Sequence, residues 1–96
     1  MTPRAKLDAI AIEQRLAALD QWELRDGKLH RDFVFADFER AFSFMTAVAG
    51  VAEEMNHHPE WSNVYNRVAV DLVTHDAAGI TELDFSLARA MDQLAG

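Results

Sequence analysis

The chain has 96 residues with a formal net charge of −7 at pH 7, and we expect one domain over residues 1–96. Half of the residues are apolar, as in ordinary globular proteins, but no apolar run approaches the ~20 residues that span a bilayer. The acidic balance argues against direct binding of nucleic acid, and the lack of cysteine excludes disulfides and thiolate ligands.

Two features of the sequence bear on its location. The N-terminal stretch MTPRAKLDAI lacks the apolar core of a secretory signal peptide. A chain without cysteine also suits a reducing compartment. We therefore expect a cytoplasmic location.

The first third of the chain predicts a helix followed by a hairpin. Asp8 is a candidate N-cap for a helix over 9–19, whose apolar stripe comprises Ile12, Leu16 and Leu19. The stretch WELRDGKLHRDFVF then alternates apolar and polar residues, and the Asp-Gly pair at 26–27 is a hairpin turn signal. We expect strands near 21–25 and 28–35.

Residues 37–56, DFERAFSFMTAVAGVAEEMN, predict a long helix. Its apolar arc covers about half of the circumference, whereas facing a core requires only ~100°. The arc comprises Phe38, Ala41, Phe42, Phe44, Met45, Val48, Ala49, Val51, Ala52 and Met55. One side should therefore pack on a sheet and the other on a second copy of the chain, which predicts a homodimer or homotetramer.

The last third predicts two strands and a helix. EWSNVY indicates a short strand, and the alternation of Val68, Val70 and Leu72 with less apolar residues indicates a second one. A helix over 81–95 begins with a capping-box-like pattern, and its buried stripe comprises Leu83, Leu87, Met91 and Leu94. The order α-β-β-α-β-β-α predicts an α+β fold, with a four-stranded antiparallel sheet and helices packed on one face.

The pair His57-His58 follows the long helix and precedes Pro59, which stops the helix. Just past a helix C-terminus both imidazoles could project into one pocket, or they could simply interact with the helix dipole. Glu53 lies four residues before His57, one turn below it on a continuing helix. A carboxylate there could orient the imidazole, or it could be a solvated residue at the helix border.

The remaining polar and aromatic candidates have simple structural explanations as well. His75 ends a strand pattern and should face solvent unless the strand ends or bulges before it. Asp84 is an N3 residue of a helix cap. Trp61 and Tyr65 suit a core, or the wall of a site for a flat heterocycle. His30 lies in the predicted hairpin without local partners, and no role is assigned to it.

A zinc site is a weaker prediction than a metal-free acid–base site. Three histidines and an open position form a known catalytic zinc centre. However, adjacent histidines are not a usual chelating pair, and no pair is spaced four residues apart. Nucleophilic catalysis ranks lower still, because there is no thiol and no serine or threonine stands out. We expect no metal and no cofactor.

Taken together, these residues resemble the pterin-4a-carbinolamine dehydratase family. Its pattern is an acidic residue, three residues, His-His-Pro, five residues, an aromatic residue, nine residues, His, and then Asp. The chain satisfies every spacing with Glu53, His57-His58-Pro59, Tyr65, His75 and Asp84. The strings FMTAVA and HHPEWSNVYNRVAVDLVTH also look like the family, and the resemblance covers nearly the whole chain.

The resemblance implies a site as well as a fold. His57, His58 and His75 would surround a pterin and carry out acid–base chemistry without metal. The family further implies that the pocket is supported and shaped by Glu53, Pro59, Trp61, Tyr65 and Asp84. Asn56 stands where some members carry aspartate, a departure that bears on the orientation of His57 and leaves the core motif intact.

The activity implied by the resemblance is elimination of water from 4a-hydroxytetrahydropterin, the 4a-carbinolamine, to give quinonoid dihydropterin. This reaction recycles the cofactor of aromatic amino acid hydroxylases. Some animal members also act as dimerisation cofactors of a transcription regulator, so a protein-binding role is the alternative. A paralogue that uses the same pocket for another pterin-like compound is a third reading.

Overall fold

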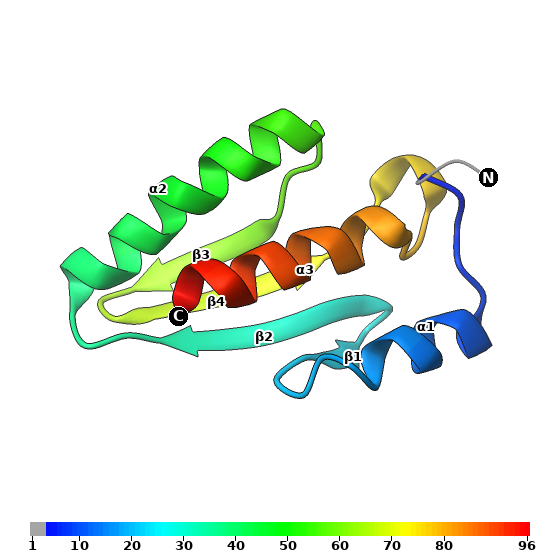
Figure 1. Ribbon diagram of the computed structural model, residues 1–96, viewed down its shortest axis with the longest axis horizontal. Helices are drawn as coiled ribbons and strands as arrows, with labels where there is room; N and C mark the ends of the chain where they lie inside the picture. The colour runs from blue at the N-terminus through cyan, green and yellow to red at the C-terminus, as the bar shows by residue number, and fades with distance from the viewer. Residues whose placement is uncertain (1–3) are drawn as a thin grey trace.

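The computed structural model describes residues 4–96 (Figure 1). Residues 1–3, which belong to the stretch expected not to be a signal peptide, lie outside the described residues. The elements are α1 (Ala9–Leu16), β1 (Glu23–Arg25), β2 (Lys28–Val34), α2 (Phe38–Met55), β3 (Glu60–Val64), β4 (Arg67–Leu72), the short 3-10 helix η1 (His75–Ala77) and α3 (Glu82–Ala95). Within the described part of the chain, no helix is both long and apolar enough to cross a membrane.

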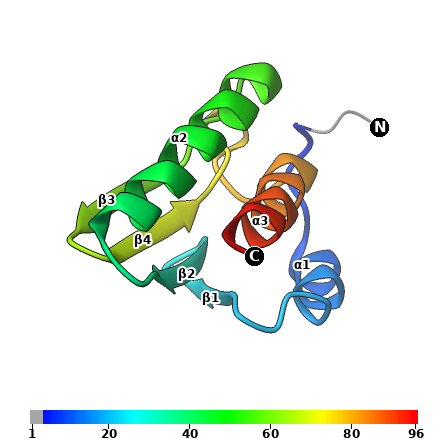
Figure 2. The same ribbon diagram turned by 60° about the vertical axis from the view of Figure 1, so that its left-hand side comes forward.

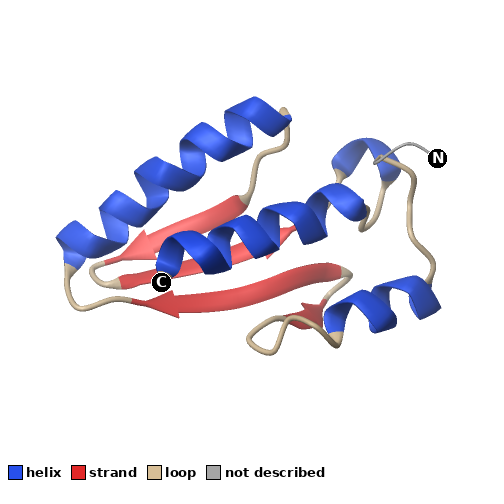
Figure 3. Ribbon diagram, viewed as in Figure 1, coloured by secondary structure: helices blue, strands red, loops and turns tan. Residues whose placement is uncertain are grey.

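The four strands form one antiparallel sheet in the order β1-β2-β4-β3. Helices α2 and α3 lie on the same side of this sheet, while α1 lies near β1 (Figure 2). The side chains between sheet and helices are apolar and almost fully buried, among them Leu29, Phe33, Val68, Val70, Leu72, Phe85 and Met91. The α+β fold, with helices on one face of a four-stranded sheet, is thereby confirmed (Figure 3).

The N-terminal helix begins where the sequence predicts and ends earlier. The Asp8 carboxylate accepts a hydrogen bond from the Ala11 amide at 2.8 Å, as an N-cap should. The helix ends at Leu16 instead of residue 19, and Leu19 is buried in the turn that follows. Strand β1 is also shorter than expected, because Trp22 is buried outside it and its amide bonds to the Leu19 carbonyl.

The hairpin turn is the one that its residues favour. Asp26 and Gly27 both adopt positive φ, 51° and 76°. Two-residue hairpin loops of this kind need positive φ at both central positions, which an Asp-Gly pair tolerates. The turn fixes the register of β1 on β2, with Leu24 opposite Leu29.

The long helix α2 has the two apolar sides that its sequence predicts. Ala41, Phe44 and Val48 are buried against the core. Phe38 and Phe42 lie outside it and remain 48% and 54% exposed, with their ring centroids 5.6 Å apart. In α3 the predicted stripe is correct at Leu87 and Met91 but wrong at Leu94, which is exposed near the helix end; Phe85 and Ala88 are buried instead.

Candidate active site

The end of α2, the start of β3 and the end of β4 lie at the same end of the sheet (Figure 1). Residues of these segments line a pocket of about 430 Å³. These segments meet because β3 and β4 are antiparallel, with Glu60 opposite Asp71. We call it the histidine pocket; its lining residues are Arg4, Asn56, His57, His58, Pro59, Glu60, Val73, Thr74, His75 and Asp76. The three histidines that the family motif selects are therefore brought together, from the α2–β3 and β4–η1 connections.

The way α2 ends determines where the paired histidines point. Asn56 adopts a left-handed conformation, φ 51° and ψ 44°, which asparagine tolerates better than most residues. The His57 amide then bonds to the Ala52 carbonyl at 3.0 Å, which closes the helix end. As a result the two neighbours diverge, with His57 buried and His58 exposed.

His57 is held by a buried carboxylate. Its Nε2 lies 2.6 Å from Asp84 Oδ1, and the two side chains are only 5% and 0% exposed. The other oxygen of Asp84 accepts hydrogen bonds from the Thr74 hydroxyl and the Thr81 amide, both at 2.9 Å. The same carboxylate that completes the capping box of α3 therefore also fixes the imidazole of His57.

This contact assigns the two nitrogens of the neutral His57 ring. A carboxylate accepts hydrogen bonds, so Nε2 carries the proton and Nδ1 carries the free lone pair. Among residues 4–96, the only buried side-chain nitrogen or oxygen without a hydrogen-bond partner is His30 Nε2. His57 Nδ1 has no hydrogen-bond partner among residues 4–96 and is not one of these unpartnered buried atoms, so it remains available as an acceptor on the pocket side.

His58 and His75 have carboxylate partners of their own in an exposed setting. His58 Nε2 lies 2.6 Å from Glu53 Oε2, and His75 Nε2 lies 2.7 Å from Glu60 Oε2. Glu53 therefore contacts His58 and not His57, its expected partner. The physical reason is that α2 ends at Met55, so His57 does not continue the helical face on which Glu53 lies.

His75 reaches the pocket because β4 ends before it. The strand stops at Leu72, Thr74 forms an isolated bridge with Gly79, and His75 opens η1. Its side chain is 73% exposed at the pocket rim. The condition that the sequence left open, an end to the strand before His75, is thus met.

The other candidate residues lie at different distances from the pocket. Pro59 lines it directly, whereas Trp61 packs against the core beside it, opposite Val70. Tyr65 lies in the β3–β4 turn, at the far end of that hairpin, and is exposed. The structure does not bring Tyr65 to the histidine pocket of the same chain.

Sequence reasoning gave no role to several pocket residues, of which Glu60, Thr74 and Arg4 make contacts that shape the site. Glu60 bonds to His75, and Thr74 bonds to Asp84. These contacts depend on which residues face each other across the strands, so the sequence alone does not reveal them. Arg4 donates from Nη2 to the Asn56 carbonyl at 2.7 Å, and its Nη1 lies 3.6 Å from Asp76 Oδ2. It links the two sides of the pocket from an N-terminal segment that carries no motif.

His30 lies outside the lining of this pocket. No partner was assigned to it from the sequence, but the strand register places two carboxylates beside its ring. Its Nδ1 is 2.9 Å from Asp71 Oδ1 and its Nε2 is 3.2 Å from Asp32 Oδ2. Burial by itself lowers the pKa of His30, but the hydrogen bond to Asp71 and the nearby carboxylates of Asp71 and Asp32 outweigh it, so the pKa is raised.

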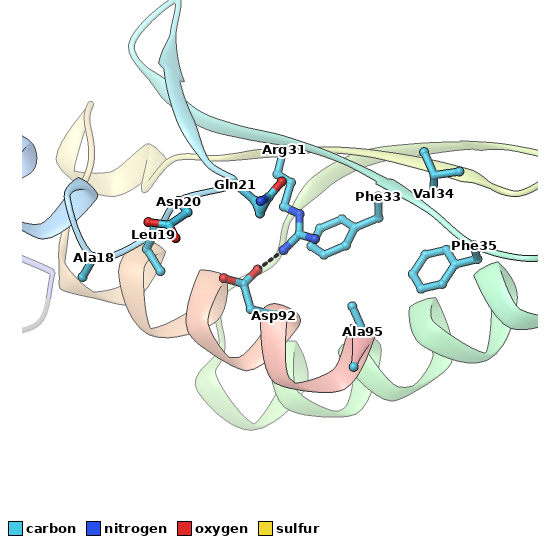
Figure 4. Close-up of a pocket in the computed structure, with 11 residues that line it drawn as sticks. Ala18, Leu19, Asp20, Gln21, Arg31, Phe33, Val34, Phe35, Asp92 and Ala95 are labelled. Carbon is cyan, nitrogen blue, oxygen red and sulfur yellow. Dashed lines mark hydrogen bonds and ion pairs between the residues drawn. The ribbon is translucent and has the colours of Figure 1, made fainter.

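A second hollow, of about 400 Å³, lies between β2 and α3 (Figure 4). Arg31 and Asp92 point toward each other across it and form an ion pair. The guanidinium also lies 4.0 Å from the centre of the Phe33 ring, and Asp92 accepts a hydrogen bond from Trp22 Nε1. These charged groups are satisfied by one another, which is typical of a structural contact.

Comparison with known proteins agrees with the geometry. Residues 5–94 match the family model described as pterin 4 alpha carbinolamine dehydratase. Proteins provisionally named pterin-4-alpha-carbinolamine dehydratase, from Solibacter usitatus and Chelativorans sp., are 56% identical over 90 residues and 53% identical over 94 residues. Those alignments cover 94% and 96% of this chain, and 95% and 96% of the relatives.

A solved structure gives the same result for the fold. The crystal structure of a transcriptional coactivator/pterin dehydratase from Brucella melitensis superimposes with a TM-score of 0.92 at 47% sequence identity. The match covers 95% of this chain and 99% of that one. The chain belongs to the pterin 4 alpha carbinolamine dehydratase family, a family of hydro-lyases.

Proposed function

We propose that the protein dehydrates 4a-hydroxytetrahydropterin to quinonoid dihydropterin by histidine acid–base catalysis. The observation that carries the proposal is one pocket lined by His57, His58 and His75, each with its own carboxylate partner. Family membership supports the pterin as substrate. The product would re-enter the cofactor cycle of an aromatic amino acid hydroxylase.

The reaction needs only proton transfers. In a carbinolamine the hydroxyl group and a ring nitrogen share one carbon. A general acid protonates the departing hydroxyl, which leaves as water, while a base removes the proton from a ring nitrogen as the new double bond forms. Histidine, with an ordinary pKa near 6.5, can serve in either role at neutral pH.

We assign the leading acid–base role to His57. Its ring is fixed by Asp84, and its Nδ1 has no hydrogen-bond partner among residues 4–96, so it can meet a bound ring in one defined orientation. His58 and His75, on the exposed side, would share the other proton transfers and the binding. Glu53 holds His58, Pro59 lines the pocket, and Trp61 packs against the core.

No metal or cofactor is part of the proposed mechanism. Residues 4–96 contain no group of three histidine, aspartate or glutamate side chains arranged as metal ligands, and the chelator arm of the experiment below tests the metal-free mechanism. Tyr65 stays in the proposed set of supporting residues on the family motif alone, because it lies at the other end of its hairpin.

The test is the dehydration rate of freshly generated 4a-hydroxytetrahydropterin, followed by ultraviolet absorbance with and without a chelator. Wild type should accelerate the reaction equally in both conditions. His57→Ala should reduce the rate by about 10²-fold or more, since one acid–base group contributes ~10²–10⁴-fold. His30→Gln is the matched control, because it removes a histidine outside the pocket lining and should leave the rate unchanged.

Each result has a clear meaning. No acceleration by folded wild type would contradict the dehydratase proposal. Acceleration abolished by chelator would retain the activity but overturn the metal-free mechanism. Equal losses in His57→Ala and His30→Gln would indicate a folding defect and remove the catalytic assignment of His57.

We also propose that the outer side of α2 joins copies of the chain into a homodimer or homotetramer. The exposed Phe38 and Phe42 supply adjacent apolar rings on this side. Sedimentation at micromolar concentration should show an oligomer that Phe42→Glu dissociates. A stable wild-type monomer would contradict this assignment.

The second candidate function is that of a protein-binding cofactor for a transcription regulator. The Brucella melitensis protein is described as a transcriptional coactivator as well as a pterin dehydratase. In that role the α2 surface would bind the regulator, and His57→Ala would leave binding intact. A protein that binds a regulator but does not dehydrate the pterin would favour this reading.

A further inference from the structure

Glu60 lies at the start of β3 and joins the two sides of the histidine pocket. We propose that Glu60 is a positioning residue, which holds the imidazole of His75 toward the bound pterin and is itself oriented by Lys28. This inference rests on the proposed function, because it concerns how the same site is kept ready for the reaction.

Both oxygens of the Glu60 carboxylate have a partner. Oε2 lies 2.7 Å from His75 Nε2, and Oε1 lies 2.6 Å from Lys28 Nζ. The hydrogen bond from Lys28, followed by that from His75, holds the pKa of Glu60 below its usual value. The group is therefore a carboxylate at neutral pH and is occupied on both sides, which leaves it little freedom to rotate.

The fold explains why this carboxylate meets this histidine. Glu60 pairs with Asp71 in the ladder between β3 and β4, and β4 ends one residue later. His75 follows in η1, so past Leu72 it is not held by the ladder. The Glu60 side chain extends from the last paired position and bridges this gap.

Lys28 reaches Glu60 from another strand. It begins β2, which is separated from β3 by β4 in the sheet order. Its ammonium group occupies Oε1 and so leaves Oε2 for His75. Three side chains from two strands and η1 thus form a line that ends in the pocket.

His75 needs such a partner more than His57 does. The side chain of His57 is only 5% exposed, whereas the side chain of His75 is 73% exposed. An exposed imidazole populates several rotamers, and a misplacement of about 1 Å can cost about 10²-fold in rate. The carboxylate of Glu60 selects one orientation and leaves the Nδ1 of the neutral ring free for the substrate.

The same contact should contribute little to folding. Glu60 and Lys28 are each a little over one-third exposed, and exposed ion pairs add only a small amount to stability. Positioning and structural roles can therefore be separated by experiment. A positioning residue changes the rate and the motion of His75 without changing the denaturation midpoint.

The variants are Glu60→Ala, Glu60→Gln, Glu60→Asp and Lys28→Met, each alone, and Glu60→Ala combined with His75→Ala. The matched control is Glu23→Gln, which changes a carboxylate on β1 of the same sheet that pairs with Arg25. Initial rates of pterin dehydration give kcat and KM. In parallel, ¹³C relaxation of the ring carbons of His75 and His57 reports their mobility without requiring turnover.

We expect Glu60→Ala to lower kcat by about 10-fold with KM changed less than about 2-fold, a loss within the range of misplaced catalytic groups. Glu60→Gln and Lys28→Met should lose less, and Glu60→Asp should recover part of the rate. In the His75→Ala background, removal of Glu60 should cost less than about 2-fold, because its partner is already absent. The His75 ring should become more mobile in Glu60→Ala, the His57 ring should not, and Glu23→Gln should match wild type.

Three results would overturn the proposal. The first is unchanged mobility of the His75 ring in Glu60→Ala. The second is a full and additive loss of rate when Glu60 is removed in the His75→Ala background. The third is a loss of rate that a lower denaturation midpoint explains. If wild type failed to dehydrate the pterin, the proposed function would fall, and the ring relaxation alone would still decide whether Glu60 positions His75.

Discussion

The histidine pocket contains the same chemical pair, an imidazole and a carboxylate, in two environments. On the inner side, His57 and Asp84 are buried, and Asp84 serves three donors at once. On the rim, His58, Glu53 and His75 are mostly open to solvent, and Glu60 is a little over one-third exposed. The distances are nearly equal, 2.6 to 2.7 Å, so distance alone does not distinguish these pairs.

What differs is the cost of removing one partner. A buried group left without its partner loses a hydrogen bond that water cannot replace, whereas an exposed group is rehydrated. The inner pair should therefore couple stability to activity, and the rim pairs should affect activity alone. Four experiments test this contrast.

The largest effect is expected for Asp84→Ala. It leaves the His57 imidazole, the Thr74 hydroxyl and the Thr81 amide without their acceptor and removes one half of the helix cap. Breaking a buried pair of this kind costs about 3–5 kcal/mol of unfolding free energy. Urea denaturation measures it, with Asp84→Asn as the milder companion, and a loss below about 1 kcal/mol would contradict the inner role.

The comparison of His57→Ala with His75→Ala separates the two environments directly. Both should reduce dehydration, but only His57→Ala leaves a buried carboxylate oxygen unpartnered, at about 1–3 kcal/mol. His75→Ala should change the unfolding free energy by less than about 0.5 kcal/mol, because the His75 side chain that contacts Glu60 is largely exposed. Equal destabilisation by the two variants would remove the distinction.

His30 tests a buried imidazole that lies outside the pocket lining. Because Asp71 and Asp32 raise its folded-state pKa above the unfolded value, the contribution of His30 to stability is complete below the unfolded pKa, near 6.5. That contribution should be lost as pH rises through the folded pKa. Urea midpoints between pH 5 and 9 should fall more steeply in wild type than in His30→Gln, and parallel curves would contradict this.

The smallest effect is expected for Glu53→Gln. This residue is exposed and holds an exposed histidine, so the unfolding free energy should change by at most about 0.5 kcal/mol. The small difference from wild type should also shrink further in high salt, because exposed charges are screened. A loss of unfolding free energy above about 1 kcal/mol would show that the Glu53–His58 pair contributes to stability as the buried His57–Asp84 pair is expected to.

The sequence predicted those features that depend on residues close together in the chain. Asp8 caps α1, the Asp-Gly pair forms the hairpin turn, and Thr81 with Asp84 forms the capping box, all as expected. The positions of α2, β2, β3 and β4 follow from period and turn residues in the same way.

The errors and omissions concern contacts between distant segments. Glu53 was considered as a partner of His57 on a continuing helix, or as a solvated residue at the helix border, whereas the left-handed Asn56 ends the helix and Glu53 contacts His58. The partners of His30 and His75 depend on which residues face each other across β2, β4 and β3, and no local pattern contains that register.

The double use of Asp84 has a practical consequence. The Thr81 amide donates to the same carboxylate that holds His57, so its proton senses any change in that carboxylate. A pterin that forms a hydrogen bond with His57 or exchanges a proton with it should shift the Thr81 amide resonance and alter its hydrogen exchange. Thr81 itself lies outside the pocket lining. One backbone signal at the start of α3 can thus report occupancy of the site without any label on the ligand.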